Sequence, residues 1–178
     1  MNSPAVQALT FCLRAQFYQI QAALTPQSLS TFWEALSKRL YEKACSRLLL
    51  HYFVSTTGAV ILNRDVEALR SVSMLSGSDH AHWDTLRELL TLYMTPSNSL
   101  KSILVGPERD INSGKGLFNR AGQEKSLVFM SRRSDFRTKT NAGFKTSEWA
   151  RNLLSDLGVK DPSEKPLDPS LFAADRKS

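Results

Sequence analysis

The sequence predicts an all-α fold, an antiparallel bundle of about five to seven helices in one domain. Apolar residues recur at spacings of three and four along most of the chain, the period of a helix with one buried face. Proline and glycine punctuate these stretches, as expected for turns between helices. We find no strand-length alternation of apolar and polar residues, so no sheet is expected.

Length and composition fit a single domain with a real core. The chain has 178 residues, of which 42% are hydrophobic. It has no apolar run long enough to span a membrane and no basic segment followed by an apolar region that would mark a secretory signal. Cys12 and Cys45 fall inside helical patterns and are expected to be buried, reduced thiols.

The first three helices are expected over residues 4–24, 26–54 and 59–75. Thr25 suits the cap of the second helix, and Pro26 suits its first position, where a missing N–H costs nothing. Gly58 is expected to lie in the turn before the third helix. Four aromatic residues in helical stripes are assigned to the core: Phe32, Trp33, Trp83 and Tyr93.

The remaining elements are shorter. Ser78 and Asp79 can cap a fourth helix that carries Trp83 and Tyr93, and Pro96-Ser97 begins a short fifth helix. A glycine-rich loop is expected over 106–122, a sixth helix over 123–138, and a turn-rich segment over 140–145. A small helix then passes through Trp149 and ends at Gly158. The bundle is assigned to 1–158 and a disordered tail to 159–178.

Positive charge is concentrated near the end of the expected sixth helix. The net charge is +6, and residues 130–151 hold six basic and two acidic side chains. Such a cluster fits an acidic protein, an anionic membrane or nucleic acid, or a solvated face with no partner. The candidate contact residues are Arg132, Arg133, Arg137 and Lys139. Asp135 is three residues after Arg132, the spacing of a surface ion pair on a helix.

Motifs that carry chemistry are weak. Asn112-Ser113-Gly114-Lys115-Gly116 lacks the leading glycine and the hydroxyl residue of a phosphate-binding loop. His80 and His82 are two positions apart and face different sides of a helix, so we assign no metal site and read the histidines as helix-end or surface residues. A serine-histidine-acid constellation was not found. We therefore expect no enzyme activity, no cofactor and no small-molecule substrate.

Several short segments occur in a recognisable order. Gly58-Ala59 is followed by the charged pair Arg64-Asp65, then by leucine-rich helices over 86–104, and then by Arg133-Ser134-Asp135-Phe136. Asp65 has no partner on its own helix, because Ala68 and Leu69 occupy the facing positions, so any strong partner must be tertiary. Over residues 29–138 this order resembles the C-terminal helical region of the Sec-ten subunit of the exocyst, with Gly58, Arg64, Asp65, Asp135 and Phe136 at motif positions.

The resemblance implies a non-enzymatic, rod-like helical subunit, or a fragment of a longer one. Such a subunit packs against other tethering subunits and helps to hold secretory vesicles at the plasma membrane, in the cytoplasm at sites of fusion. An anionic membrane surface is a further expected partner. A similar glycine turn and Asp-Phe-Arg ending occur in subunit four of the conserved oligomeric Golgi complex, which is the alternative. An alternative of another class is a small basic nucleic-acid-associated helical protein, although no nucleic-acid motif is apparent.

Overall fold

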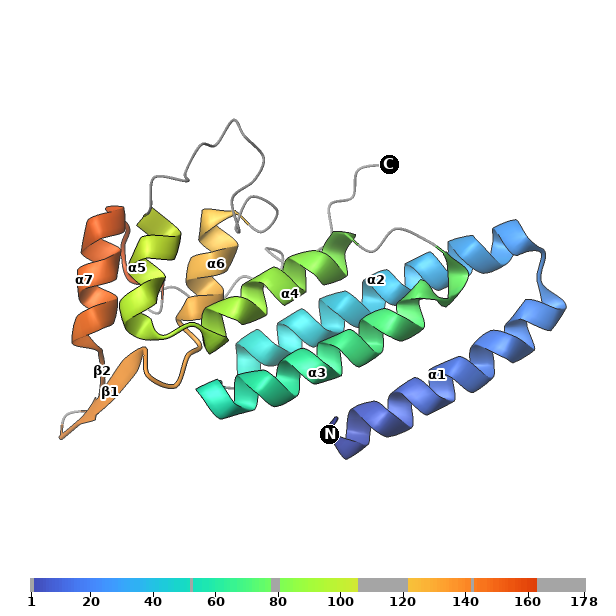
Figure 1. Cartoon of the computed structure of the whole chain (residues 1–178), viewed down its shortest axis with the longest axis horizontal. Coiled ribbons are helices and arrows are strands. Elements are labelled where there is room, and N and C mark those ends of the chain that lie inside the picture. The colour runs from blue at the N-terminus through green and yellow to red at the C-terminus, as the bar shows by residue number, and fades with distance from the viewer. Residues whose placement is uncertain (1, 52, 78–80, 106–121, 142, 163–178) are drawn as a thin grey trace.

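A computed structural model describes residues 2–51, 53–77, 81–105, 122–141 and 143–162, and its helical architecture confirms the predicted fold class. Within those ranges it has seven α-helices, one short 3-10 helix and one two-stranded hairpin (Figure 1). The helices are α1 (Pro4–Ala23), α2 (Pro26–His51), α3 (Thr56–Ser73), η1 (Met74–Ser76), α4 (Ala81–Met94), α5 (Ser97–Val105), α6 (Gln123–Met130) and α7 (Glu148–Leu157). The strands are β1 (Arg137–Thr140) and β2 (Gly143–Thr146).

The molecule is elongated, with two differently built ends. Helices α1 to α4 run along its length in alternating directions, and α5, α6 and α7 stand beside one another at the far end of α4 (Figure 1). The ion pairs Arg70–Asp84 and Arg87–Glu67 align α3 and α4 antiparallel. Helix α4 thereby belongs to both ends, because it packs on α2 and α3 and also on α6.

Capping residues set where the long helices begin. The Ser3 hydroxyl accepts from the N–H of Val6, and Thr25 Oγ1 accepts from the N–H of Ser28 at 3.3 Å. Pro26 takes the first helical position, as its sequence context predicts. Ser55 Oγ accepts from the N–H of Gly58 at 3.1 Å, which starts α3 at Thr56. These side chains satisfy amide groups that have no partner within the helix.

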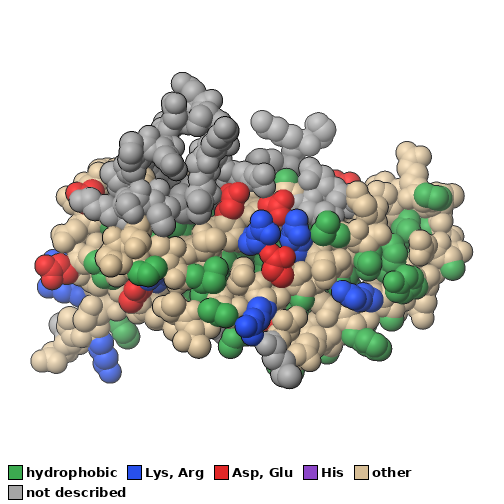
Figure 2. Space-filling model, in the orientation of Figure 1, with side chains coloured by type: hydrophobic (Ala, Val, Ile, Leu, Met, Phe, Trp, Pro, Cys, Tyr) green, Lys and Arg blue, Asp and Glu red, His purple; other side chains and the backbone are tan. Residues whose placement is uncertain are grey.

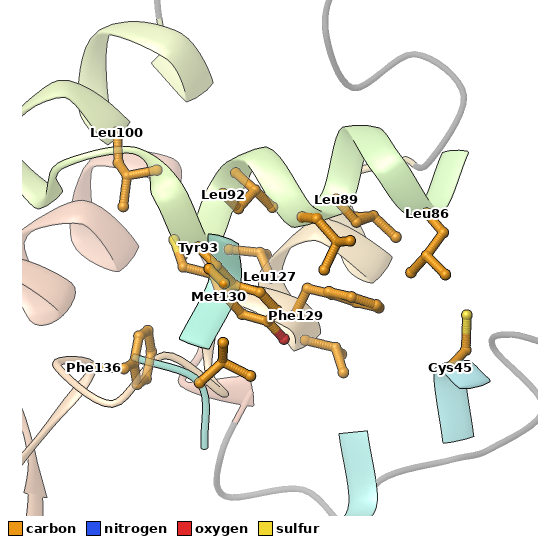
Figure 3. Packing of buried hydrophobic residues seen from close by; sticks show 14 of the residues in the cluster. Cys45, Leu86, Leu89, Leu92, Tyr93, Leu100, Leu127, Phe129, Met130 and Phe136 are labelled. Atoms are coloured by element: carbon orange, nitrogen blue, oxygen red, sulfur yellow. The ribbon is translucent and has the colours of Figure 1, made fainter. Parts of the chain in front are cut away.

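The main core forms where α4 crosses α2, α3 and α6. Its fully buried side chains include Trp83, Leu86, Leu89 and Tyr93 from α4 and Phe129 from α6. Figure 3 shows how Leu86, Leu89, Tyr93 and Phe129 lie in this core. The rings of Tyr93 and Phe129 stack with centroids 5.7 Å apart. The Trp83 indole N–H donates to Ser37 Oγ at 2.9 Å, so burial leaves that donor satisfied.

A second, smaller core joins α1 to α2 and α3. It consists of Phe17, Leu29, Trp33 and Val72. Phe17 meets Trp33 edge-on at 4.8 Å between centroids, and the Trp33 indole N–H donates to the Val72 carbonyl oxygen at 3.1 Å. Phe17 is the one fully buried residue of α1, and the partly buried Val6, Leu13 and Ile20 pack against the two cores along the same helix.

The prediction that no strand would form is wrong. The sixth helix ends at Met130 rather than near 138, and β1 and β2 pair antiparallel with Lys139 opposite Phe144 and Thr140 opposite Gly143. The chain leaves the helix through tight turns, in which the N–H groups of Arg132 and Arg133 donate to Phe129 and Met130 carbonyl oxygens. The chain then forms backbone hydrogen bonds with the connection after α2. This pairing between distant segments replaces the hydrogen bonds that a longer helix would have made.

Several local expectations also need correction. Phe32, assigned to the core, is 45% exposed, and Cys12 is exposed while Cys45 is buried. These two errors have one cause: the core faces of α1 and α2 are narrower than their apolar stripes, so some apolar positions remain outside. Gly58 lies inside the first turn of α3 rather than before it, because the Ser55 cap starts that helix earlier than expected.

Some predictions fall outside the described residues. These are the loop 106–121, including Asn112 to Gly116, the proposed Ser78-Asp79 cap, His80, and the tail from 163 onward. Residues 159–162 are described and remain attached to the bundle. Val159 packs against the main core, and Asp161 accepts a hydrogen bond from Thr146 Oγ1.

Candidate functional site: the basic end of the bundle

The basic segment after α6 is fixed to the connection between α2 and α3. The Val54 N–H donates to the Arg132 carbonyl oxygen at 2.8 Å, and the Ser134 N–H donates to the Val54 carbonyl oxygen at 3.0 Å. Val54 and Arg133 thus form an isolated parallel bridge. This pairing determines which way each of the following side chains points.

Arg133 points inward and closes the end of α4. It is 3% exposed, and its Nε and Nη2 each donate to one carboxylate oxygen of Asp135 at 2.8 Å. Its Nη1 donates to the carbonyl oxygens of Leu92 and, at 2.6 Å, Thr95. We call this group the Arg133 clasp: Arg133, Asp135 and the carbonyls of Leu92 and Thr95.

The clasp provides hydrogen-bond donors and positive charge at the C-terminal end of α4. The last carbonyl groups of a helix have no partner within it, and a cation there also meets the negative end of the helix dipole. The bidentate pairing with Asp135 neutralises the guanidinium and fixes its plane. Arg133 was predicted as a partner contact, and the structure instead places it inside the chain. It therefore does not contribute to the basic surface in this structure.

Phe136 and Trp149 complete the motif around the clasp. Phe136 is fully buried and meets Trp149 edge-on at 5.9 Å between centroids. The Trp149 indole N–H donates to the Asp135 carbonyl oxygen at 3.0 Å, and the Arg133 guanidinium lies 5.4 Å from the Trp149 ring centre. Arg133, Asp135 and Phe136 thus join α4, α7 and the base of the hairpin.

Arg132 differs from its neighbour, because it is only partly buried. Its guanidinium is 5.5 Å from the centre of the exposed Phe53 ring, a cation–π contact. Its Nε is buried without a hydrogen-bond partner, and partial burial lowers the pKa of the guanidinium. The expected pairing of Arg132 with Asp135 is replaced by the bidentate Arg133 pairing.

Arg137 and Lys139 lie on β1, on the same face of the hairpin. Lys139 is exposed and lies opposite Phe144, which is 72% exposed. The sequence prediction missed Phe144 and Lys145, because it assigned no strands here. A signal was present: Thr138 and Thr140 favour strand conformation, and Asn141 and Gly143 favour a turn. Gly143 has a φ of 123°, which strongly favours glycine.

The other motif positions are structural. Asp65 is 8% exposed, and its Oδ1 accepts from the Ser3 N–H at 2.8 Å, so the tertiary partner that the sequence required is the start of α1. Arg64 is exposed. A Cβ at Gly58 would lie 3.2 Å from Ser55 Oγ, the atom that caps α3, so a larger residue would crowd that cap.

Chemical groups suited to catalysis are scarce in this part of the chain. Burial raises the pKa of the Cys45 thiol to about 12, which keeps it neutral and a poor nucleophile. Over the described ranges, no group of three or more histidine, cysteine, aspartate or glutamate residues is placed to hold a metal ion. The helices described here include none that is long and apolar enough to cross a bilayer.

These features define a class, an α-helical bundle protein whose candidate sites are interaction surfaces. The family model described as "Exocyst complex component Sec10-like, alpha-helical bundle" matches residues 1–144, so the chain belongs to the Sec10-like family. The match includes the motif positions from Gly58 to Phe136 and also α1, which the sequence resemblance did not cover. No curated protein and no solved structure matches significantly. Family membership indicates a subunit of an exocyst-type tethering complex.

Proposed function

We propose that this chain is a non-enzymatic subunit of an exocyst-like tethering complex that helps to dock secretory vesicles at the plasma membrane. The family match over residues 1–144 carries the proposal. The elongated bundle supports it, because long helices lying side by side offer extended faces for neighbouring subunits (Figure 1). The chain would act in the cytoplasm, peripherally at sites of vesicle fusion, with other complex subunits as its partners.

The outer face of α1 is the best-supported protein contact. Phe11 is 77% exposed and Tyr18 is 63% exposed, and Ala15 and Ala22 complete a stripe spaced four, three and four residues apart. This spacing puts all four on one narrow helix face. Figure 2 shows hydrophobic side chains gathered toward the end where α1 meets α2. We call these four residues the α1 stripe.

The occupant we propose for the α1 stripe is an uncharged helix face of another subunit. Arg14 is the one charged residue in α1, and it donates to Ser71 Oγ at 3.2 Å. The stripe therefore presents no charge to a partner and offers large side chains separated by alanines. Such a surface packs well against a second helix, whose own side chains fill the spaces above the alanines.

The test is recovery of partners from cell lysate with the tagged chain, read by mass spectrometry. Exocyst subunits should be recovered, and Phe11→Ser with Tyr18→Ser should reduce their recovery severalfold. Ile61→Ser is the matched control, because Ile61 is also an exposed apolar side chain but lies on α3. Circular dichroism on each variant verifies that the bundle is intact.

Other recoveries would overturn the proposal in distinct ways. Golgi tethering subunits in place of exocyst subunits would assign the chain to the Golgi complex. Nucleic-acid-binding proteins in place of both would favour the basic nucleic-acid-associated alternative, as would a salt-dependent shift of RNA or DNA. Equal loss in the Ile61 control would show that the α1 stripe has no special role.

A further inference from the structure

The β1–β2 hairpin extends away from the helices and ends in exposed side chains. It projects beyond the helical body near α7 (Figure 1), and basic side chains lie along that margin of the surface (Figure 2). Each strand has four residues, so the ladder reaches about 13 Å at ordinary strand rise. The contacts that hold the hairpin to the bundle lie at its base rather than at its tip.

The exposed residues at the outer part of the hairpin combine one aromatic ring with positive charge. Phe144 is 72% exposed and lies opposite Lys139, so both side chains are on the same face. Lys145, the next residue, is also exposed, and it lies opposite Thr138 on the other face of the hairpin. The sequence from Arg137 to Ser147 contains no acidic residue. Covering this exposed ring with an apolar phase would be favourable, in proportion to the apolar area removed from water.

The base of the hairpin is held firmly, which makes the tip a positioned element. Phe136, just before β1, is fully buried, and its carbonyl oxygen accepts from the Ser147 N–H at 2.8 Å. Thr146 donates to the Asp161 carboxylate. Thr146 belongs to the residue pair at the base of the ladder, three pairs from the Thr140–Gly143 pair at its outer end. The Asp161 carboxylate therefore does not neutralise the charge of the tip.

We propose that this hairpin tip binds an anionic membrane surface, with the Phe144 ring entering the lipid interface and Lys139 and Lys145 contacting the headgroups. Charge complementarity selects the occupant: the tip is wholly cationic, and the cytoplasmic leaflet is anionic. A bilayer requires no matching groove, and a convex two-stranded tip offers none to a folded protein. Aromatic rings with basic neighbours are suited to the boundary between headgroups and acyl chains.

The inference deepens the proposed function, on which it rests for its biological setting, by naming the partner of the basic end. The Lys139 contact expected from sequence becomes a membrane contact, with Arg137 beside it on β1. Arg137 precedes the tip on the same face as Lys139, and Arg132 lies before the hairpin base. Arg133 is excluded, because its charge is used inside the clasp.

The experiment measures partition of the purified full chain onto phosphatidylcholine vesicles with and without phosphatidylserine. Each basic residue near such a surface contributes about fivefold in partition, so Lys139→Glu with Lys145→Glu should reduce it by more than roughly tenfold. Phe144→Ser should reduce it severalfold. High salt should weaken binding of the wild-type chain, because the charges are exposed.

Matched controls distinguish binding through the tip from the effects of net charge and of any exposed aromatic ring. Lys43→Glu with Arg47→Glu makes the same change in net charge on an exposed part of α2. Phe32→Ser removes another exposed aromatic ring, which is also on α2. Both should retain partition within about twofold of wild type. Thermal unfolding verifies that every variant is folded.

Insertion of the ring has its own readout. Phe144→Trp should gain a blue-shifted emission component on anionic vesicles and should be quenched by lipids with brominated acyl chains. The wild-type chain, with its three native tryptophans, provides the background. If emission from the introduced indole were not quenched, insertion of the ring would be overturned.

Several results would overturn the proposal as a whole. These are absence of binding to anionic vesicles, equal binding to neutral vesicles, equal loss in the α2 charge control, or binding of RNA but not of vesicles. None of them changes the outcome of the partner recovery. Failed vesicle binding with exocyst subunits recovered would refute the membrane contact alone, whereas the reverse would refute the tethering assignment alone.

Discussion

Helices α1 and α4 show opposite relations between charge and burial. Seven of the fourteen residues of α4 are buried, although it carries three charged residues, whereas α1 has 20 residues, one charge and one buried residue, Phe17. The helix with less charge is therefore the more exposed one. The difference supports the proposal that the outer face of α1 contacts another subunit, whereas α4 is buried by elements of this chain. Four measurements test that contrast.

The largest effect is expected from the centre of α4. Trp83→Ala should lower the free energy of unfolding by about 3–5 kcal/mol, because it empties a fully buried site and removes the hydrogen bond from the indole to Ser37 Oγ. Urea denaturation measures this value. A loss below about 1 kcal/mol would contradict the view that α4 is the centre of the core.

Removal of the Arg133 clasp should cost somewhat less. Arg133→Met leaves Asp135 and the carbonyls of Leu92 and Thr95 without their donor, which should lower stability by about 2–4 kcal/mol. The expected loss is at the lower end for a broken buried ion pair, because the Asp135 side chain is 46% exposed and can be hydrated once Arg133 is gone. Arg132→Met is the control, and equal losses in the two variants would refute an internal role for Arg133.

High pH should weaken the core beside α4. Burial raises the pKa of Cys45 from 9.0 to about 12, so the folded protein binds this proton more tightly than the unfolded chain. The resulting stability is full below pH 9 and is lost as pH rises toward 12, with a slope of up to about 1.4 kcal/mol per pH unit from this thiol. The buried phenols of Tyr41 and Tyr93, whose pKa values burial also raises, act in the same direction.

Chemical denaturation at several pH values measures that slope. The Cys45→Ala variant removes the thiol together with its electrostatic effect on Tyr41 and Tyr93, while burial still raises the pKa of both phenols. The wild-type chain should lose stability more steeply than the variant between pH 9 and pH 12. Parallel slopes would show that the thiol has no part in the decline.

The smallest effect on folding is expected at the α1 stripe. Phe11→Ser with Tyr18→Ser should change the free energy of unfolding by less than about 0.5 kcal/mol per residue, because both rings are mostly in solvent. The same urea denaturation as for Trp83→Ala gives a direct comparison. A loss of several kcal/mol would mean that the two rings already pack against this chain and are not available to a partner.

Local sequence signals predicted the helices well, because they act over a few residues. Thr25 and Pro26 start α2 as expected, and Gly158, with a φ of 66°, ends α7 in the left-handed conformation. The helical period also identified Trp33, Trp83 and Tyr93 as core residues. The same period placed Phe32 in the core, because it cannot show how wide a buried face will be.

The basic end was less predictable, because its structure depends on distant partners. Arg132 and Arg133 are adjacent and chemically identical, yet one lies over an exposed ring and the other is buried. What separates them is a set of carbonyl oxygens at the end of α4, about forty residues earlier. The hairpin was missed for a related reason: its strands are short, polar and exposed, so they have little apolar alternation.

The bridge between Val54 and Arg133 has a consequence for how the chain folds. Pairs such as α1–α2 and α3–α4 join neighbours in sequence, so they can form early with a small loss of chain entropy. The bridge and the clasp join segments from three distant parts of the chain, so closing them costs more chain entropy. We therefore expect folding to end with a single guanidinium entering the end of α4, which locks the order of the helices.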